Sequence, residues 1–429
     1  MSKRYHKSEL MLERARKTIP LGAQTFSKSI TQYPYGVSPY FVAKAQGGRL
    51  WDVDGNEYID FINGLAAITL GYNDPDVNDA VQRQVEEGSI FSLSHPLEFK
   101  VAEKVVEMVP CAEMVRFGKN GSDATSGAVR IARACTGRDH VAVCGYHGWQ
   151  DWYIGSTLRN LGVPEATKAL THTFHYNDSG SLQSLLEKSK GKFAAVILEP
   201  MNIYDPIPGF LEEVQQLTHE HGALLIFDET ITGFRFANGG AQEYFGIVPD
   251  LATFGKGLAN GYPLSVVTGK EKYMQAMEEI FFSFTFGGET LSLAAALATM
   301  TKLQEHPVTK TLYKIGNILG NGVRRLIISH HVEHIFSFQG NPSWSFLLIQ
   351  DVEPYSQWQI KTLFLQEMFS RGILTLGSHN ICYAHTEKDI SRLLEVYDEV
   401  FPFIRDVVAS RDVESALKCD PLQSLFRVR

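Results

Sequence analysis

Two short apolar runs in the middle of the chain each lead to a group that can ionise. The run Ala223–Phe227 precedes Asp228 and Glu229, and Leu251–Phe254 precedes Lys256 across one glycine. Apolar runs of this length are typical of buried strands. The carboxyl ends of strands line the ligand crevice of an open α/β sheet. The pattern therefore predicts that an acid and a lysine, 28 residues apart (256 − 228), share one pocket wall.

An acid and a lysine in one pocket suit the chemistry of pyridoxal phosphate. The carboxylate can keep a heterocyclic nitrogen protonated, and the lysine can form an imine with an aldehyde. Plainer interpretations exist for each residue alone. Asp228 and Glu229 could be a helix cap or a surface pair, and Lys256 could simply be solvated. The choice depends on what else the chain supplies.

A turn that could hold a phosphate joins the strand pattern Met114–Phe117 to the helical pattern Ser122–Ala134. Gly121 permits a close backbone approach, and Ser122 adds a hydroxyl donor. The free N–H groups and the positive dipole end of a new helix favour an anion. Ser122 or Asp123 could instead only cap the helix.

Two further groups follow strand patterns at the same predicted edge. Tyr146 and His147 come after His140–Cys144, where an aromatic ring could lie flat on a cofactor. Glu199 follows Ala194–Leu198 and could add an acid to the crevice. The alternatives are a loop aromatic that packs locally and a surface carboxylate.

The elements that would carry these groups alternate between strand and helix from about residue 113. This alternation predicts a mostly parallel sheet covered by helices on both faces, and hence an α/β fold. The strand patterns are Met114–Phe117, His140–Cys144, Thr171–His175, Ala194–Leu198, Ala223–Phe227, Leu251–Phe254 and Ser265–Thr268, and the clearest helical patterns between them are Ser122–Ala134, Ser181–Lys188 and Leu211–Glu220.

The two ends of the chain have a different character. Helical and strand patterns before residue 113 suggest a separate lobe, and those after residue 304 suggest a second, smaller α+β domain. The early patterns are Ser8–Thr18, Tyr40–Ala45, Arg49–Val53, Glu57–Phe61, Asp76–Glu87 and Glu98–Val109; the later ones, which follow a long helical pattern at Thr290–Gln304, are Ile335–Phe338, Ser345–Ile349, Leu374–Leu376 and Ile381–Ala384.

Length and composition agree with a large enzyme. The 429 residues suit a large α/β domain with a smaller companion, and 44% apolar with 21% charged residues is ordinary for a soluble protein. The net charge of −8 comes without a basic run that would indicate nucleic-acid binding. The apolar run Leu291–Met300 is too short to span a membrane. Five cysteines without paired spacing predict reduced thiols, no metal site and a cytoplasmic protein.

Taken in order, these stretches resemble the class III pyridoxal phosphate-dependent aminotransferases of fold type I. The resemblance covers nearly the whole chain and is closest to the glutamate-1-semialdehyde aminomutase branch, to which Tyr383–Ile390 is particularly similar. The other segments that carry it are Glu13–Pro20, Leu50–Asp60, Phe227–Arg235, Ala241–Gly246 and Pro249–Leu251.

The resemblance implies a fold type I architecture and a homodimer. The large cofactor-binding domain, with a seven-stranded sheet, is expected over residues 61–290. The small α+β domain is expected to be built from both chain ends, with residues 1–60 joining residues 291–429.

The resemblance also implies roles for single residues. Lys256 would carry the internal aldimine and then act as base, Asp228 would hold the pyridine nitrogen protonated, and Tyr146 would stack on the ring. Gly121 and Ser122 would bind the phosphate, Ile231 would pack on the other ring face, and His147, Glu199 and Asn202 would lie near the cofactor. Thr285 matches a threonine that reaches the phosphate of a neighbouring subunit, so the active sites would be shared across the dimer interface.

The chain departs from its relatives where substrates bind. Cys382 stands near the place of an arginine that many class III enzymes use for the substrate α-carboxylate, and the aminomutase branch lacks this arginine too. Thr25 and Lys28 stand where the aminomutase branch has a serine and an arginine, and Leu65 stands where it has a tryptophan over the substrate. A lysine cannot form the bidentate contact of an arginine, so carboxylate recognition would be weaker or different. Thr25 and Lys28 could also be inert loop residues.

These departures favour an aminotransferase that acts on a carbonyl compound other than a simple α-keto acid, with sugar-derived carbonyls as one candidate class and glutamate as a candidate donor. Pyridoxamine phosphate would be the intermediate cofactor form. The alternative within enzymes is a 2,1-aminomutase, and a loop over Trp152–Ala169 is the candidate for retaining its intermediate. A catalytically silent cofactor-binding protein is the alternative from another class.

Overall fold

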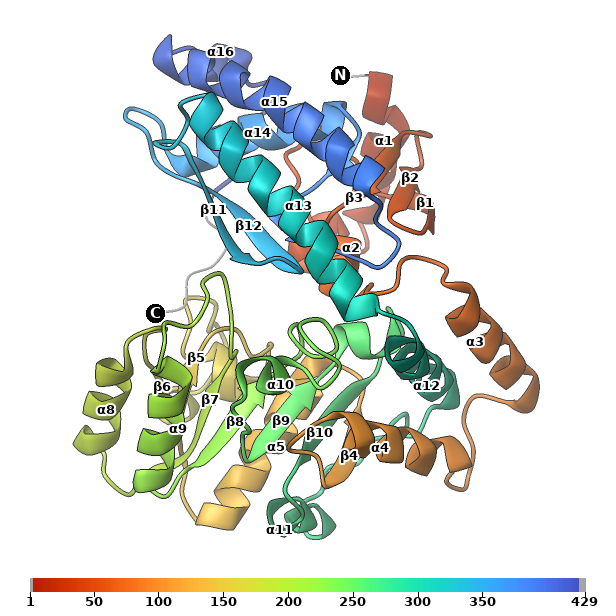
Figure 1. Ribbon diagram of the computed structural model, residues 1–429, viewed down its shortest axis with the longest axis vertical. Coiled ribbons are helices and arrows are strands. Elements are labelled where there is room, and N and C mark those ends of the chain that lie inside the picture. The colour runs from red at the N-terminus through yellow and green to blue at the C-terminus, as the bar shows by residue number, and fades with distance from the viewer. Residues whose placement is uncertain (1–2, 424–429) are drawn as a thin grey trace. The chain divides into compact units, whose positions relative to one another are not determined.

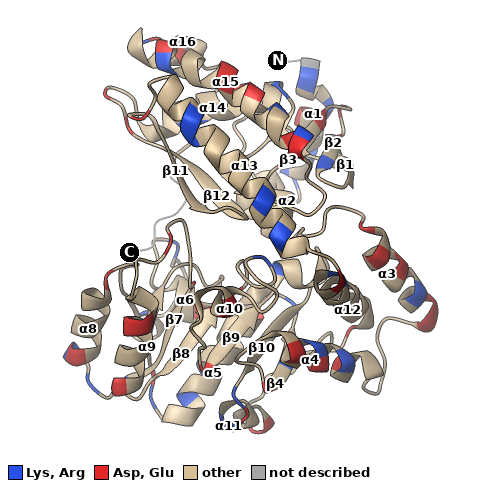
Figure 2. Cartoon of the chain, in the orientation of Figure 1, with Lys and Arg blue, Asp and Glu red and all other residues tan. Residues whose placement is uncertain are grey.

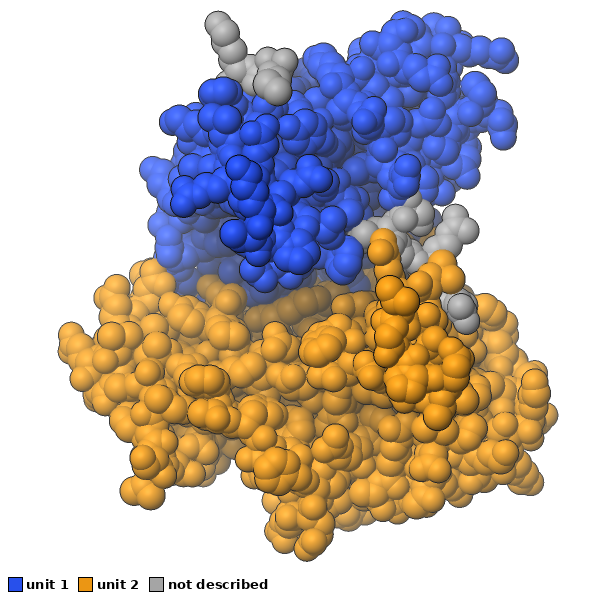
Figure 3. Space-filling view, turned by 180° about the vertical axis from the view of Figure 1, so that it is seen from behind, with its two compact units in different colours: residues 1–74, 310–425 blue, residues 75–309, 426–429 orange. Residues whose placement is uncertain are grey.

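The computed structural model describes residues 3–423 and divides into two compact units, coloured separately in Figure 3. We call Pro75–Thr309 the central unit. We call the described residues up to Asp74 and from Lys310 onward the terminal unit. The outermost residues of the two predicted end segments, 1–2 and 424–429, lie outside the described range.

The central unit is built on one seven-stranded sheet, which confirms the predicted α/β class (Figure 1). The strand order is β4-β10-β9-β8-β7-β5-β6. The strands from β9 to β6 are parallel, and β10 is antiparallel to both of its neighbours. All seven strands overlap the predicted patterns, with ends that differ by at most two residues: β4 Met114–Gly118, β5 His140–Cys144, β6 Thr171–Thr173, β7 Phe193–Leu198, β8 Leu224–Asp228, β9 Leu251–Phe254 and β10 Ser265–Gly269.

Helices cover both faces of this sheet because side chains alternate along its strands. In β5, Val141 and Val143 pack with α5 (Gly121–Thr136), whereas Ala142 and Cys144 pack in a cluster with α8 (Ser179–Lys188) and α9 (Phe210–Glu220). Charged side chains lie mainly on the helices and connections, while the strands β7, β8 and β9 are almost free of charge (Figure 2). A sheet buried on both faces needs such apolar strands, and the few polar groups remain at the strand ends.

The terminal unit contains two smaller sheets. One has the order β1-β2-β3-β13 and the other β11-β12-β14. Their strands are β1 Val42–Gln46, β2 Arg49–Asp52, β3 Glu57–Asp60, β11 Phe336–Asn341, β12 Trp344–Ile349, β13 Ile373–Leu374 and β14 Ser378–Asn380; the helices are α1 His6–Ala15, α2 Asn63–Ala66, α13 Val308–Ser329, α14 Gln357–Ser370, α15 Glu387–Ala409 and α16 Val413–Ala416.

One predicted strand was wrong. Residues Ile381–Ala384 form a turn, and the strand at this place is β14, which ends at Asn380. The chain leaves the sheet there because Cys382 N–H donates to His385 Nδ1 at 3.1 Å and His385 N–H donates to the Cys382 carbonyl at 3.0 Å. An apolar run of four residues does not by itself distinguish a strand from a buried turn.

The unit boundaries lie later in the chain than the expected ones at residues 60 and 290. Residues 61–74 stay with the terminal unit, where Asn380 Nδ2 donates to the Ile62 carbonyl at 2.7 Å and Tyr72 donates to Asp60 at 2.7 Å. Helix α12 (Thr290–Glu305) stays with the central unit because it packs on α3 (Pro75–Glu87) and α4 (Pro96–Met108). No helix among residues 3–423 is long and apolar enough to cross a membrane.

Candidate active site

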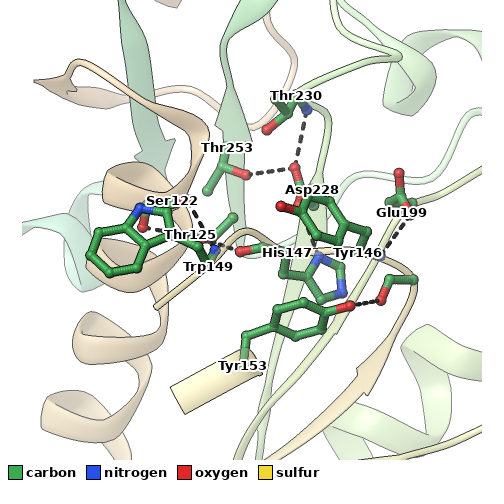
Figure 4. A network of polar contacts seen from close by, with 11 residues as sticks. Ser122, Thr125, Tyr146, His147, Trp149, Tyr153, Glu199, Asp228, Thr230 and Thr253 are labelled. Carbon is green, nitrogen blue, oxygen red and sulfur yellow. Dashed lines mark hydrogen bonds and ion pairs between the residues drawn. The ribbon is translucent and has the colours of Figure 1, made fainter. Parts of the chain in front are cut away.

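A buried acid lies at the carboxyl end of β8 (Figure 4). Asp228 is 4% exposed and accepts a hydrogen bond from His147 Nδ1 at 2.8 Å. Its other oxygen accepts from Thr230 N–H at 3.1 Å and from Thr253 Oγ1 at 3.3 Å. Burial alone would raise the pKa of Asp228, but the hydrogen bonds and charge of His147 and the bonds from Thr230 outweigh it and lower the pKa. The carboxylate is therefore held ionised, and hydrogen bonds to both of its oxygens fix its orientation.

His147 is the group that orients this carboxylate. Its side chain is buried between aromatic rings, lying parallel to Trp152 at 6.4 Å and edge-on to Tyr153 at 5.2 Å. Its main-chain carbonyl accepts a hydrogen bond from Thr125 Oγ1 of α5 at 2.9 Å. The sequence and the resemblance placed His147 beside Tyr146 and near the cofactor, but its partnership with Asp228 required the fold.

Lys256 follows β9, the strand next to β8, so the lysine and Asp228 lie at the same edge of the sheet. Lys256 has a left-handed backbone with φ of 44°, which is costly for a residue with a side chain and is typical of functional positions. Burial lowers the pKa of its ammonium, although the carboxylates of Glu199 and Asp228 oppose this. A lysine that is neutral more often is a better nucleophile and base.

Glu199 provides a second carboxyl group at this edge. Its Oε2 accepts from Tyr146 N–H at 2.9 Å, and Gly145, with φ of 106°, leaves the space that Glu199 occupies. A Cβ on Gly145 would lie 2.5 Å from Glu199 Oε2. Burial and the nearby charge of Asp228 raise the pKa of Glu199 to about 7. Glu199 therefore exchanges its proton close to neutral pH.

The stability of the cofactor-free protein should record this shift. The unfolded chain ionises Glu199 near pH 4.5, whereas the folded chain keeps it protonated up to about pH 7. Stability should fall as the pH rises through this window, because the folded state then binds more protons than the unfolded state. We expect the melting temperature of Glu199→Gln to fall less than that of the wild type between about pH 5 and 7. Glu278 is exposed, so Glu278→Gln is the control. An equal dependence of melting temperature on pH in all three proteins would contradict the raised pKa of Glu199.

The predicted phosphate turn lies at the start of α5, a 16-residue helix. Asp123 accepts from the N–H groups of Lys119 and Asn120 at 3.0 and 2.7 Å and thereby caps the helix. Within the described part of the chain, the N–H groups of Gly121 and Ser122 have no hydrogen-bond acceptor. Two free donors at a helix N-terminus fit a phosphate group.

Gly148 keeps the neighbouring loop against this turn. Its φ is 102°, and a Cβ at this position would lie 2.3 Å from Ser122 Oγ and 3.1 Å from Ser122 Cα. The next residue, Trp149, donates its N–H to Ser122 Oγ at 3.3 Å. The loop that carries Tyr146 and His147 and the turn that carries Ser122 are therefore packed together.

Substitution of Gly148 tests this packing. We expect Gly148→Ala to weaken pyridoxal phosphate binding at least tenfold and to lower the free energy of unfolding by about 1–3 kcal/mol, the usual cost of a strained backbone position. Gly162→Ala is the matched control, since Gly162 has φ of 89° and nothing within 4 Å of its Cβ position. Titration of the cofactor and urea unfolding measure the two effects. Equal cofactor affinity in both variants would show that the contact with Ser122 is unimportant.

The remaining expected cofactor residues belong to the central unit but differ in exposure. Ile231 is half-buried and Thr285 is exposed. Asn202 is half-buried, and its side-chain oxygen accepts from Tyr204 N–H at 3.1 Å within a local turn. Tyr146 is 54% exposed, and burial of the rest raises the pKa of its hydroxyl. The roles expected for these four residues remain predictions.

Sequence reasoning missed two polar groups of the site. Thr253 supports Asp228 from the neighbouring strand, but a threonine inside a strand pattern carries no local signal. Arg235 is only 1% exposed, and its charge helps to lower the pKa of Lys256. Arg235 closes the motif that begins at Phe227, and this position was the available signal.

The candidate substrate residues lie in the terminal unit. Lys28 and Leu65 line a cavity of about 330 Å³ whose other walls are mainly apolar and aromatic. Thr25 is exposed and does not line the cavity. Four consecutive residues, Asn63–Ala66, have positive φ between 46° and 65° and form a left-handed turn in which Leu65 is held. Cys382 is fully buried.

The segment proposed as a closing loop is partly anchored. Helices α6 (Asp151–Ile154) and α7 (Glu165–Lys168) lie within it or at its start. Trp152 Nε1 donates to Ser126 Oγ at 3.0 Å, and Tyr153 donates to the Gly145 carbonyl at 2.8 Å. The centre of the segment is exposed, with Leu161 wholly so. A closing role for this centre remains a prediction.

Comparison with known proteins gives a consistent result. The family model described as aminotransferase class-III matches residues 32–385. The chain is 34% identical over 403 residues to 3-aminobutyryl-CoA aminotransferase of Cloacimonas acidaminovorans, covering 92% of this chain and 96% of that one. It is also 34% identical to glutamate-1-semialdehyde 2,1-aminomutase of Syntrophobacter fumaroxidans, covering 94% and 99%.

A solved structure agrees with these sequence relatives. The pyridoxal phosphate internal aldimine form of the FumI protein of Sphingopyxis sp. MTA144 superimposes with a TM-score of 0.87 at 28% identity, covering 96% of this chain and all of that one. An omega-transaminase of Sphaerobacter thermophilus gives a TM-score of 0.85 at 26% identity, covering 93% and 98%.

Proposed function

The chain belongs to the class III aminotransferase family and is a pyridoxal phosphate-dependent enzyme, and we propose that it moves an amino group from an amino donor to a carbonyl substrate. The observation that carries this proposal is the juxtaposition of two groups at adjacent strand ends. Asp228 is kept ionised by His147, and Lys256 has a lowered pKa. These are the states that the chemistry requires.

The residues of the site fit the cofactor in kind and in charge. When bound, pyridoxal phosphate supplies an electron sink for the carbon next to the substrate amine. Asp228 would hold the ring nitrogen protonated, with His147 fixing the carboxylate. Gly121 and Ser122 would donate to the phosphate, and Tyr146 would cover one ring face, with Ile231 on the other. Lys256 would hold the cofactor covalently and later carry the proton removed from the substrate carbon.

The substrate is proposed to be a carbonyl compound other than a simple α-keto acid. Cys382 is buried where the resemblance expects an arginine, and Lys28 is a single-point cation beside a largely apolar cavity. Asp60 also lines this cavity, which therefore suits a ligand with apolar surface and hydrogen-bonding groups. A sugar-derived carbonyl with a hydrophobic face and a non-carbohydrate ketone are both compatible, and glutamate is the first donor to test.

We propose that the working enzyme is a homodimer. Two segments of the central unit expose large apolar side chains: Leu93 is 84% exposed, Phe281 83% and Phe286 56%. The segments are adjacent, since Thr290 N–H donates to the Ser89 carbonyl at 3.0 Å. Apolar surface of this kind is typical of a protein interface, and Thr285 lies between these phenylalanines. A second copy covering this face would receive Thr285 near its own phosphate turn.

The second candidate function is a 2,1-aminomutase. The observation in its favour is that several relatives with 33–34% identity over more than nine tenths of this chain are glutamate-1-semialdehyde 2,1-aminomutases. A mutase keeps its intermediate between the two half-reactions, so it needs no stoichiometric donor. Leu65 in place of a tryptophan and Lys28 in place of an arginine weigh against glutamate-1-semialdehyde itself.

A half-reaction screen tests the proposal. The enzyme loaded with pyridoxal phosphate is mixed with single amino donors, and the visible absorbance of the bound aldehyde form is followed. A donor that removes this absorbance, with release of its keto product, supports amino transfer. Isomerisation of glutamate-1-semialdehyde without any donor would support the mutase. Absence of visible absorbance in the loaded protein would overturn both functions.

A further inference from the structure

An ion pair links the phosphate turn to the segment that carries Thr285. Lys119 Nζ lies 2.9 Å from Glu289 Oε2, and the side chain of each residue is 16% exposed. The two residues are 170 positions apart in the chain. Lys119 precedes Gly121 by two residues, and Glu289 follows Thr285 by four. The pair therefore joins two segments that the proposed function assigns to phosphate binding.

Glu289 is fully engaged at its end of the pair. It caps α12 by accepting from Leu291 N–H at 2.6 Å and from Ser292 Oγ at 2.7 Å. Burial opposes its ionisation, but the hydrogen bonds from Lys119, Ser292 and Leu291 outweigh burial and lower its pKa. The carboxylate thus remains charged and is fixed to the first turn of a long buried helix.

Lys119 is fixed as firmly at the other end. Its N–H donates to Asp123, the residue that caps α5. The neighbouring glycine, Gly118, leaves room for Phe284, whose ring lies 3.6 Å from the position of a Gly118 Cβ. The Phe284 ring in turn packs edge-on against Phe282 with their centres 5.1 Å apart. Both ends of the exposed segment are therefore held on the body of the central unit.

Between these anchors the segment is exposed. A turn closes from Gly287 N–H to the Phe284 carbonyl at 3.0 Å, and Thr285 and Phe286 lie at its tip. An exposed turn of this kind is ordered by its anchors rather than by burial of its own side chains. Loss of the Lys119–Glu289 contact would therefore loosen the tip without removing any group from it.

We propose that Lys119 and Glu289 are positioning residues for phosphate binding, because they couple a chain's own phosphate turn to the loop that the same chain presents to a second copy. This inference rests on the proposed homodimeric function. Neither residue needs to contact the phosphate. The pair acts on two sites: it orders α5 for the phosphate of its own chain and Thr285 for the phosphate of the partner subunit.

Single substitutions test the pair in the full-length protein. Lys119→Met and Glu289→Gln should each raise the dissociation constant for pyridoxal phosphate about tenfold, a common size for loss of one charged contact. The double variant should have a dissociation constant no higher than that of the single variant that binds the cofactor less tightly. The control is Lys302→Met: the Lys302 side chain, on α12, is 13% exposed and pairs with Asp76 of α3 at 2.6 Å, and Lys302 lies in the last turn of α12 whereas Glu289 caps its first turn. It should bind the cofactor like the wild type.

A mixed dimer separates the two sites on which the pair acts. One subunit carries Lys256→Ala and Glu289→Gln, and the other is wild type, so the visible absorbance reports only the wild-type subunit's site. A weakened affinity at that site supports action on the partner. Affinity equal to that of a dimer carrying Lys256→Ala alone would overturn it. Unchanged affinity in both homodimeric variants would overturn the inference altogether, whereas failure of wild-type protein to bind the cofactor would instead overturn the proposed function.

Discussion

Lys256→Ala should bind pyridoxal phosphate without visible imine absorbance and should lose at least about 10⁴-fold in turnover, the upper end for removal of a positioned proton-transfer group. The lysine is expected to have two duties: to hold the cofactor covalently and to move the proton of the substrate carbon. Its half-buried position after the end of β9 and its lowered pKa suit both. Absorbance spectra and single-turnover measurements with an amino donor follow the two effects separately.

Lys270→Ala is the matched control for this experiment. Lys270 also follows a strand of the same sheet, but it pairs with Asp250 at 3.0 Å at the opposite edge. It should retain the spectrum and the turnover of the wild type. An unchanged spectrum in Lys256→Ala, after removal of any carried-over cofactor, would assign the covalent role to another lysine.

Asp228→Asn should retain part of its cofactor affinity but lose about 10²–10³-fold in the rate of substrate C–H cleavage, as is usual when one preorganised electrostatic contact is lost. The amide has nearly the shape of the carboxylate but cannot hold a proton on the ring nitrogen. A donor labelled with deuterium at the reacting carbon measures this step directly, and its isotope effect should increase. Full activity would contradict the electron-sink role of this acid.

The neighbouring acid is the comparison for that variant. Glu229 is wholly buried and accepts from Gln242 Nε2 and Thr232 Oγ1 at 3.0 Å each, so its contacts are structural. Glu229→Gln should mainly lower the free energy of unfolding and leave the isotope effect unchanged. The two acids are adjacent in sequence, but the Asp228 variant would lower the rate of C–H cleavage and the Glu229 variant the free energy of unfolding.

The sequence predicted the sheet well because its strands are buried on both faces. Runs such as Ala194–Leu198 and Ala223–Phe227 contain almost nothing but apolar residues, and each leads to a polar group at the crevice edge. Asp228, Lys256, Ser122 and Glu199 could therefore be assigned to one edge from the sequence alone. The segment Phe227–Arg235 and the other family-like segments were the strongest signal, because they specify the order of these groups along the chain as well as their residue types.

Other features depended on contacts between distant residues and could not be predicted in the same way. The bond from His147 to Asp228 spans 81 residues, and the Lys119–Glu289 pair spans 170. The turn at Ile381–Ala384 follows from two hydrogen bonds between Cys382 and His385. The second unit boundary lies beyond the predicted residue 290 because α12 packs on α3 and α4. The apolar sequence of α12 does not show which unit it belongs to.

Strand β10 has a consequence for the reach of Lys256. Its first residues pair with Gly118 of β4 on one side and Phe254 of β9 on the other, so the ends of β4 and β9 point the same way with one strand between them. At the usual strand separation, the anchors for an anion and for an amine are about 10 Å apart. In pyridoxal phosphate the aldehyde and the phosphate arm stand on adjacent ring carbons and are closer together than this gap, so the side chain of Lys256 would have to reach across the width of β10 for both anchors to be used.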